Sequence, residues 1–556
     1  MRSRTSLFDK TILRKNLIRF APCWGLYSLG LLMMLVTRIE VGRPAYFAAN
    51  MAYTLEAMGA VNFFYALTAG LLLYGDLFNT RMCNALHALP LRRETWFATN
   101  LLSGLLFAVI PYVGTALLCL LLAVQGWAVF LLWLAVVILQ YLFFFSAATL
   151  CAYITGQRFA MALIYGLMNF FSMIAYWLVT ILYIPLLYGV VPQEDFIFLL
   201  TPAVQMSQTD YLWVETPDIW INGWENNVTF GFRDGWGYLA ICTVIGVGLL
   251  ALALRCYRKR DLEKAGDLVT IRGLGPVFLL VYTLCLGAFC HLVFNELFGY
   301  ESYLFLILGF AIGFFTGLML LRRTIRVFRW KTVGAFALFL AAFGLSFGLT
   351  WLDPLGISRY VPAAEDVTNV SINTSGTYYT GEDGTIWNDI RQIDDIRTVH
   401  RYAVENGKPD EGERCVSVTL FYELKNEKTV TREYRIPVES EAGEILRRYV
   451  SSPEYVLGWV ITGDSMVTGI EFPDPYINIS DPKQIQTLLD AVIADCKAGN
   501  LPQEWAYLRD VEVEWITLET ITSEGLRYYR DIRYSELAEN LVKWLEENKI
   551  EQAKWE

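Results

Sequence analysis

The stretch that decides the architecture is NALHALPLRRETW, residues 84–96, which separates two of the most apolar runs of the chain. NFFYALTAGLLLY (62–74) precedes it and NLLSGLLFAVIPYVGTALLCLLLAV (100–124) follows it. A soluble core does not need about 20 consecutive apolar residues, whereas a helix needs that many to cross about 30 Å of hydrocarbon. The flanking runs therefore predict membrane spans, and 84–96 is the polar turn between them.

The bulk composition agrees with a helical membrane protein. The chain has 556 residues, of which 55% are hydrophobic and 15% aromatic, and its mean hydropathy is +0.38. Strands of a membrane barrel alternate their faces over about 10 residues, so the uninterrupted apolar blocks predict helices instead. We expect a polytopic α-helical protein whose nine spans are followed by an α+β domain. The predicted spans are 20–37, 56–76, 98–124, 129–154, 160–184, 236–254, 274–294, 302–321 and 333–352.

The Lys and Arg residues of the loops predict the orientation of these spans. One set of loops, with the amino terminus, carries 21 of them, whereas the opposite set carries only Arg38, Arg43 and Arg233. By the positive-inside rule the basic loops face the cytoplasm. We therefore predict a cytoplasmic amino terminus, and an odd number of spans puts the carboxyl-terminal domain outside the membrane.

Composition divides the chain into four segments. Residues 1–19 are basic and amphipathic and are expected to lie in the cytoplasmic interface, in contact with membrane lipids. A six-span module (20–272), three additional spans (273–352) and an extracytoplasmic domain (353–556) follow. That domain has 38 Asp and Glu against 21 Lys and Arg, and this acidic balance argues against nucleic acid as a partner.

The whole segment between the two flanking spans, GDLFNTRMCNALHALPLRRETWFATN (75–100), is too polar to cross a membrane and too regular for a flexible linker. Met82, Leu86 and Leu89 have helical spacing, and Pro90 ends that helix and can open a new turn. The expected structure is a short helix along the cytoplasmic boundary that is rigidly joined to two spans, so that a push from a partner would tilt them. The alternative is a basic interfacial loop that only obeys the positive-inside rule.

Several features together resemble bacterial ABC-2-type transporter permeases, in particular those of Gram-positive antimicrobial-peptide and Ytr-type export systems. They are the basic amphipathic start, the segment ALPLRRETWFATNLLSG (88–104), and six spans before RCYRKRDLEKAGDLV (255–269). The likeness covers roughly residues 1–272, and the three further spans and the outer domain depart from it. It implies that the turn is a coupling helix that docks on a separate ATP-binding subunit. The residues carried over are Asn84, Leu86, Leu89, Pro90, Leu91, Arg92, Arg93 and Glu94.

The chain contains no G-x-x-x-x-G-K-[ST] motif, so it has no such loop to cradle the phosphates of ATP. We predict a permease subunit in the plasma membrane of a bacterium, without a cofactor of its own and not an enzyme. A cytoplasmic ABC ATP-binding subunit would drive it, and a second copy or a sister permease would complete the path. The expected cargo is amphipathic: an antimicrobial peptide, a lipid or an envelope precursor. The alternative is an envelope-stress or ligand sensor that signals through its spans without transport.

The outer domain shows an internal similarity and one cysteine pair. DDIRTVHRYAVENG (394–407) aligns with KQIQTLLDAVIADC (483–496), and a strand pair and a helix follow each, which predicts two helix–hairpin–helix units. A disulfide between Cys415 and Cys496 is chemically permitted outside the cell. Against it, Cys496 falls on the apolar face of its predicted helix.

Overall fold

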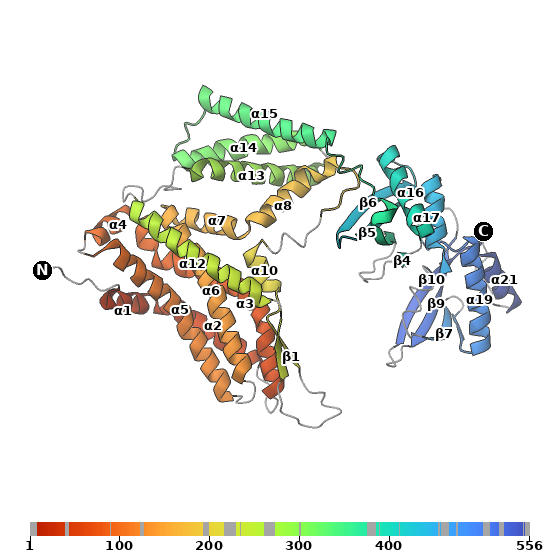
Figure 1. Cartoon of the computed structure of the whole chain (residues 1–556), viewed down its shortest axis with the longest axis horizontal. Helices are drawn as coiled ribbons and strands as arrows, with labels where there is room; N and C mark the ends of the chain where they lie inside the picture. Colours follow the sequence, from red (N-terminus) through yellow and green to blue (C-terminus); the bar gives the residue numbers. More distant parts are fainter. Residues whose placement is uncertain are drawn as a thin grey trace. The chain divides into compact units, whose positions relative to one another are not determined.

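The computed structural model describes most of the chain, and it divides into two compact units that are each described separately. The described residues are 8–38, 44–88, 91–122, 127–192, 200–215, 229–233, 235–260, 273–299, 302–374, 385–387, 390–410, 412–453, 456, 466–473, 476–503, 507, 512–521, 527–548 and 550. The first unit comprises Met1–Leu182 and Gln193–Ala342, and the second comprises Tyr183–Pro192 and Phe343–Glu556. The first is helical, apart from one small hairpin, and the second carries the larger β-sheets (Figure 1).

Seven helices in the described part of the chain are long and apolar enough to cross a membrane, and two bent helix pairs raise the number to as many as nine. The single helices are α3 (Pro44–Leu73), α5 (Arg93–Leu122), α6 (Trp127–Ile154), α12 (Gly235–Lys259), α13 (Leu274–Phe298), α14 (Tyr303–Arg322) and α15 (Trp330–Leu352). The bent pairs are α1 (Lys10–Arg19) with α2 (Ala21–Arg38), and α7 (Arg158–Asn169) with α8 (Phe171–Leu182). This confirms the prediction of a mainly helical chain with many helices that are long and apolar enough to cross a membrane.

The predicted span 160–184 corresponds to the bent pair α7 and α8 and not to one straight helix. α7 and α8 meet at 73° on either side of Phe170. Polar side chains flank the break: Asn169 donates to the carbonyl of Tyr165, and Ser172 donates to the carbonyl of Leu200. A hydropathy window gives only the mean apolarity of these residues, so it cannot detect a bend between them.

α6 is the centre of the first unit, and α3, α5 and α12 pack around it. Close approach depends on small residues: a Cβ on Gly104 would lie 1.9 Å from Cζ of Phe145. Without a hydrophobic force between helices in lipid, such close packing and interhelical hydrogen bonds must hold the bundle together. The phenol groups of Tyr65 and Tyr141 supply two of these bonds, to the carbonyls of Phe107 and Gly104.

The hairpin and the short helix of the first unit lie between α8 and α12 in sequence. α10 (Pro202–Gln208) packs on α3, and β1 (Leu212–Glu215) pairs with β2 (Thr229–Phe232). Further on, α13 and α14 are joined by glycines of α14. A Cβ on Gly309 or Gly313 would lie 2.9 or 3.0 Å from backbone atoms of α13. α15 packs sparsely, and most of its side chains are exposed.

The second unit holds two sheets built to one plan. The first half contains the strands β3 (Val367–Thr374), β4 (Thr385–Trp387), β5 (Cys415–Leu424) and β6 (Thr429–Pro437), with the helices α16 (Ile390–Asn406) and α17 (Glu441–Val450). The second half contains β7 (Met466–Pro473), β8 (Tyr476–Ile479), β9 (Glu514–Ile521) and β10 (Arg527–Tyr534), with α19 (Pro482–Ala498) and α21 (Glu539–Glu547). Both sheets are antiparallel, with the orders β4-β3-β5-β6 and β8-β7-β9-β10.

The common strand order supports the predicted duplication of the sheet domain. Each repeat also has one strand pair more than the sequence had indicated, β3 with β4 in the first and β7 with β8 in the second. The alignment of the helices also changes. α16 and α19 both have 17 residues, and matching their ends pairs Ile393 with Ile485 and Ile396 with Leu488, all buried. The sequence comparison had paired Ile396 with Ile485, one helical turn away. Amphipathic helices resemble themselves after a shift of one turn, which explains the error.

Residues 183–192, here called the strap, belong to the second unit although they follow α8 in sequence. The strap includes the 3-10 turn η2 (Ile184–Leu186), and its backbone pairs with β6: Val190 bridges Arg432, and the N–H of Glu433 donates to the carbonyl of Gly189. Gly189 has φ +80°, and a Cβ there would lie 2.0 Å from the ring of Tyr434. The sheet domain therefore has a second connection to the helices, besides the one through α15.

Candidate functional site

The polar segment 75–100, predicted between the second and third spans, contains a 3-10 turn and a short helix. A 3-10 turn, η1 (Gly75–Phe78), follows α3 directly, and α4 (Thr80–His87) begins at Asn79, whose side chain accepts from the N–H groups of Arg81 and Met82. That capping satisfies donors at the start of the helix. The helix predicted in this turn is therefore present, and α5 starts at Arg93.

The predicted docking residues divide into outward and inward groups. Asn84 and Arg92 are exposed, as are Arg81 and Met82, which the resemblance did not include. Cys83 is fully buried and holds α4 on the bundle. Leu86, Leu91 and Glu94 are intermediate in exposure, and Leu89 and Pro90 lie outside the described residues.

Arg93 points into the protein, unlike its neighbour Arg92. Its Nη1 lies 3.0 Å from each of three backbone carbonyl oxygens, those of Tyr257, Arg258 and Arg260, where α12 ends. The guanidinium carbon is 5.8 Å from the centre of the Tyr257 ring. Carbonyls at the end of a helix have no partner within the helix and carry partial negative charge, so a cation there is stabilising.

Arg260 forms a second link of this kind, and sequence reasoning missed it. Its side chain is buried, with Nη1 2.8 Å from the carbonyl oxygen of Ala152 near the end of α6 and Nη2 3.3 Å from that of Leu77 in η1. Burial lowers the pKa of its guanidinium. In the sequence Arg260 is one of several basic residues in RCYRKR, and nothing in that run marks it as the buried one.

Two ion pairs lie in the same region as Arg93 and Arg260. Arg258 Nε lies 3.0 Å from Glu94 Oε1, and Arg19 Nη1 lies 3.0 Å from Asp76 Oδ2. Both pairs are partly exposed, so each contributes little by itself. Together with Arg93 and Arg260 they join α1, η1, α5, α6 and α12 at one place. We call the four arginines Arg19, Arg93, Arg258 and Arg260 the arginine edge.

Neutral polar groups meet in the core of the same unit. The side chain of Asn62 on α3 donates to Gln140 of α6 (3.0 Å) and accepts from the phenols of Tyr112 on α5 and Tyr27 on α2. Gln140 in turn donates to the phenol of Tyr211 (3.3 Å). Asn62 and Gln140 are completely buried. In the sequence each of these residues is a lone amide inside an apolar run, and nothing there indicates that the two amides meet.

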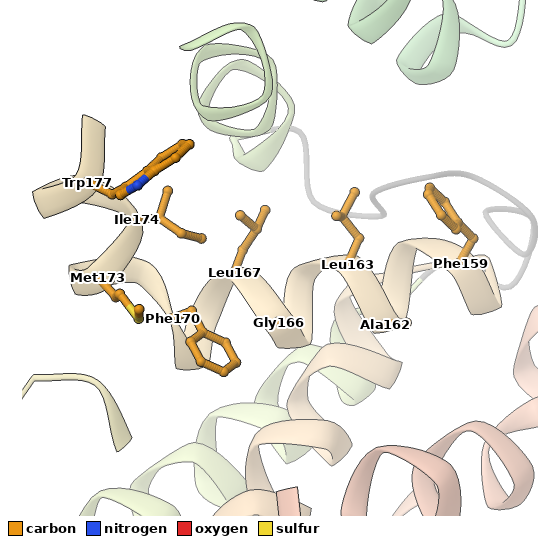
Figure 2. A pocket seen from close by; sticks show the side chains of 9 residues that line it. All are labelled: Phe159, Ala162, Leu163, Gly166, Leu167, Phe170, Met173, Ile174 and Trp177. Atoms are coloured by element: carbon orange, nitrogen blue, oxygen red, sulfur yellow. The ribbon is translucent and has the colours of Figure 1, made fainter. Parts of the chain in front are cut away.

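A groove of about 540 Å³ follows the bend between α7 and α8. Its lining is apolar: Phe159, Ala162, Leu163, Gly166, Leu167, Phe170, Met173, Ile174 and Trp177. Figure 2 shows that Phe159, Leu163 and Leu167 project from the same side of α7, with Ile174 and Trp177 beyond the bend on α8. Such a surface suits hydrocarbon and offers no group for acid–base chemistry.

Among the described residues no three His, Cys, Asp or Glu side chains gather as metal ligands. His400 is buried on α16 with Nδ1 3.2 Å from the phenol oxygen of Tyr422, and burial, Arg432 and Arg397 lower its pKa to about 3. No disulfide joins Cys415, at the start of β5, to Cys496, which is buried on α19 in the other half.

Comparison with protein-family models, with curated proteins and with solved structures finds no match to this chain.

Proposed function

We propose that the chain is the permease subunit of an ABC-type exporter that is driven by a separate ATP-binding subunit. The observation that carries this proposal is a short exposed helix, α4, that directly follows η1, and the Leu77 carbonyl of η1 accepts from Arg260 of the arginine edge. An element that faces outward and is rigidly attached to several spans is what a soluble motor needs to move a membrane bundle.

The transmission path can be followed through individual side-chain contacts. α4 continues from η1, whose Leu77 carbonyl is held by Arg260, and Arg260 also holds α6. On the other side of the turn, Arg93 ties the start of α5 to the end of α12. In this proposal motion of α4 is thereby shared by α3, α5, α6 and α12. The first three of these helices contribute Asn62, Tyr112 and Gln140 to the buried amide network. Alternating access powered by the partner would follow from tilting these helices together.

In this proposal α4 faces the cytoplasm of a bacterium and the sheet domain lies outside the plasma membrane, as the distribution of Lys and Arg favours. The cargo is amphipathic, and the apolar groove on α7 and α8 supports a path for its hydrocarbon part. A second copy or a sister permease would supply the rest of the path.

The test is co-purification with the ATP-binding subunit. Substituting Arg81→Glu and Arg92→Glu reverses two exposed charges without touching the inward-facing Arg93. We expect this variant to lose the ATPase in affinity purification from membranes while its own yield is unchanged. Nucleotide hydrolysis by the reconstituted wild-type pair should rise when an amphipathic peptide is added.

The matched control is Arg14→Glu with Lys15→Glu, which reverses two exposed charges on α1. It should keep the ATPase bound. If the α4 variant retains the subunit as well as the control does, α4 is not the docking element.

A sensor is the second candidate, and the strap favours it. Two chain segments, the strap and the extension of α15, run from the helices to the sheet domain, and Tyr183 Oη lies 2.9 Å from Ser346 Oγ between them. Two connections would carry a change in the domain to the spans better than one. Ligand binding without ATP-dependent flux in vesicles would identify a sensor, and flux would exclude a purely sensory role.

A further inference from the structure

The turn between α14 and α15, residues 322–331, combines basic and apolar side chains on one exposed surface. Its sequence is RRTIRVFRWK, and no Asp or Glu occurs anywhere from residue 302 to residue 352. The basic members are Arg322, Arg323, Arg326, Arg329 and Lys331, and all of them are exposed. We call this segment the basic turn.

Three large apolar side chains stand exposed between these charges. Ile325 is 80% exposed, Phe328 66% and Trp330 91%. Exposing such side chains to water is unfavourable at about 25 cal/mol per Å². Their alternation with Arg and Lys matches the boundary of a bilayer, where aromatic rings lie at headgroup level and cations meet lipid phosphates.

Contacts with α14 and with Thr332 fix the backbone of the basic turn, so the exposure of Ile325, Phe328 and Trp330 follows from the fold. Val327 is completely buried against Phe314 and Leu318 of α14. The hydroxyl of Thr332 donates to the carbonyl of Val327 and accepts from the N–H of Arg329 (3.0 Å). Its neighbours Arg326 and Phe328 are exposed, and the Phe328 ring also packs on Phe315 of α14 with the ring centres 4.7 Å apart.

Charge complementarity selects the partner. The side chains of Arg322, Arg326, Arg329 and Lys331 have no carboxylate partner among the described residues. The positive-inside rule explains why such a loop is basic, but it does not explain three exposed apolar side chains on a pinned backbone. We propose that the basic turn binds the surface of an anionic phospholipid bilayer, with Ile325, Phe328 and Trp330 inserted below the headgroups. This inference does not depend on transport or on an ATPase.

The experiment uses the full-length chain in detergent micelles and phosphatidylglycerol as the probe, with phosphatidylcholine as the competitor. Bound lipid is counted by native mass spectrometry. The variant Arg326→Gln/Arg329→Gln/Lys331→Gln removes three charges from the turn. Each basic residue near an anionic surface is worth about fivefold in affinity, so we expect a loss on the order of 100-fold for phosphatidylglycerol and little change for phosphatidylcholine.

The matched control, Arg81→Gln/Arg92→Gln/Lys259→Gln, removes three exposed charges elsewhere in the same unit. It should keep phosphatidylglycerol bound. A second variant, Ile325→Ser/Trp330→Ser, keeps every charge and should still weaken binding by at least about tenfold, because apolar burial is lost.

Unchanged lipid binding in the charge variant would overturn the proposal, and so would an equal loss in the control. If the charge variant instead releases a co-purified ATPase while lipid binding persists, the basic turn docks a protein and not a membrane. An unaffected Ile325→Ser/Trp330→Ser variant would refute the insertion of the apolar side chains.

Discussion

The arginine edge and the basic turn have similar composition but opposite environments. In the arginine edge, Arg93 and Arg260 turn inward to backbone carbonyls, and Arg19 and Arg258 have carboxylate partners. In the basic turn every charge faces outward, and no acidic residue lies within 302–352. The positive-inside rule counts both sets alike. The comparison shows that Arg and Lys residues in loops of equally basic composition can either hold helices together or stay exposed on the surface.

The largest expected effect separates a buried arginine from an exposed neighbour. Arg260→Met leaves carbonyls of α6 and η1 without their donor in a buried place, so we expect a loss of about 3 kcal/mol in the free energy of unfolding. Lys259→Met, one residue earlier and exposed, should stay within about 0.5 kcal/mol. Thermal unfolding of the purified variants in detergent measures both. Equal melting temperatures would show that Arg260 does not stabilise the edge.

Adjacent arginines provide the next test. Arg93→Gln removes the cation from three carbonyls at the end of α12 and should cost about 2 kcal/mol. Arg92→Gln changes an exposed side chain and should leave unfolding within about 0.5 kcal/mol of the wild type. The same unfolding assay compares the two. A larger effect at Arg92 would reverse the assignment of inward and outward roles.

The ion pair between Arg258 and Glu94 should show a smaller effect. The two side chains are 56% and 45% exposed, so their coupling energy should be below about 1 kcal/mol and should decrease with added salt. A double-mutant cycle with Arg258→Gln and Glu94→Gln measures it. A coupling of several kcal/mol that is insensitive to salt would mean that this pair is part of the buried framework.

The smallest effect on stability is expected in the basic turn itself. Arg326→Gln/Arg329→Gln/Lys331→Gln removes exposed charges that contact no described carboxylate, so unfolding should change by no more than about 0.5 kcal/mol. Thr332→Val is the internal control, because it removes the hydroxyl that pins the turn and should cost about 1 kcal/mol. Strong destabilisation by the charge variant would mean that the charges of the basic turn also stabilise the fold, as those of the arginine edge do.

Part of the candidate site could be predicted from local signals. Pro90, the helical spacing around Leu86 and the basic pair at 92–93 predicted a short helix, and α4 is present. The opposite fates of Arg92 and Arg93 could not be predicted, because two neighbouring arginines differ only in which way the start of α5 turns them. The amides Asn62 and Gln140 were visible in the sequence as single polar residues, but their pairing depends on how α3 and α6 pack.

The sequence by itself determined that the chain is mainly helical, with many helices long and apolar enough to cross a membrane, and that its carboxyl-terminal region carries sheets. Hydrophobic transfer is a local property that adds up along about 20 residues, so no knowledge of neighbours is required. Only the tertiary structure decided where α7 and α8 bend, that the strap joins β6, and which cations are buried. Those features depend on contacts between residues far apart in sequence, and a hydropathy or charge pattern contains no record of such contacts.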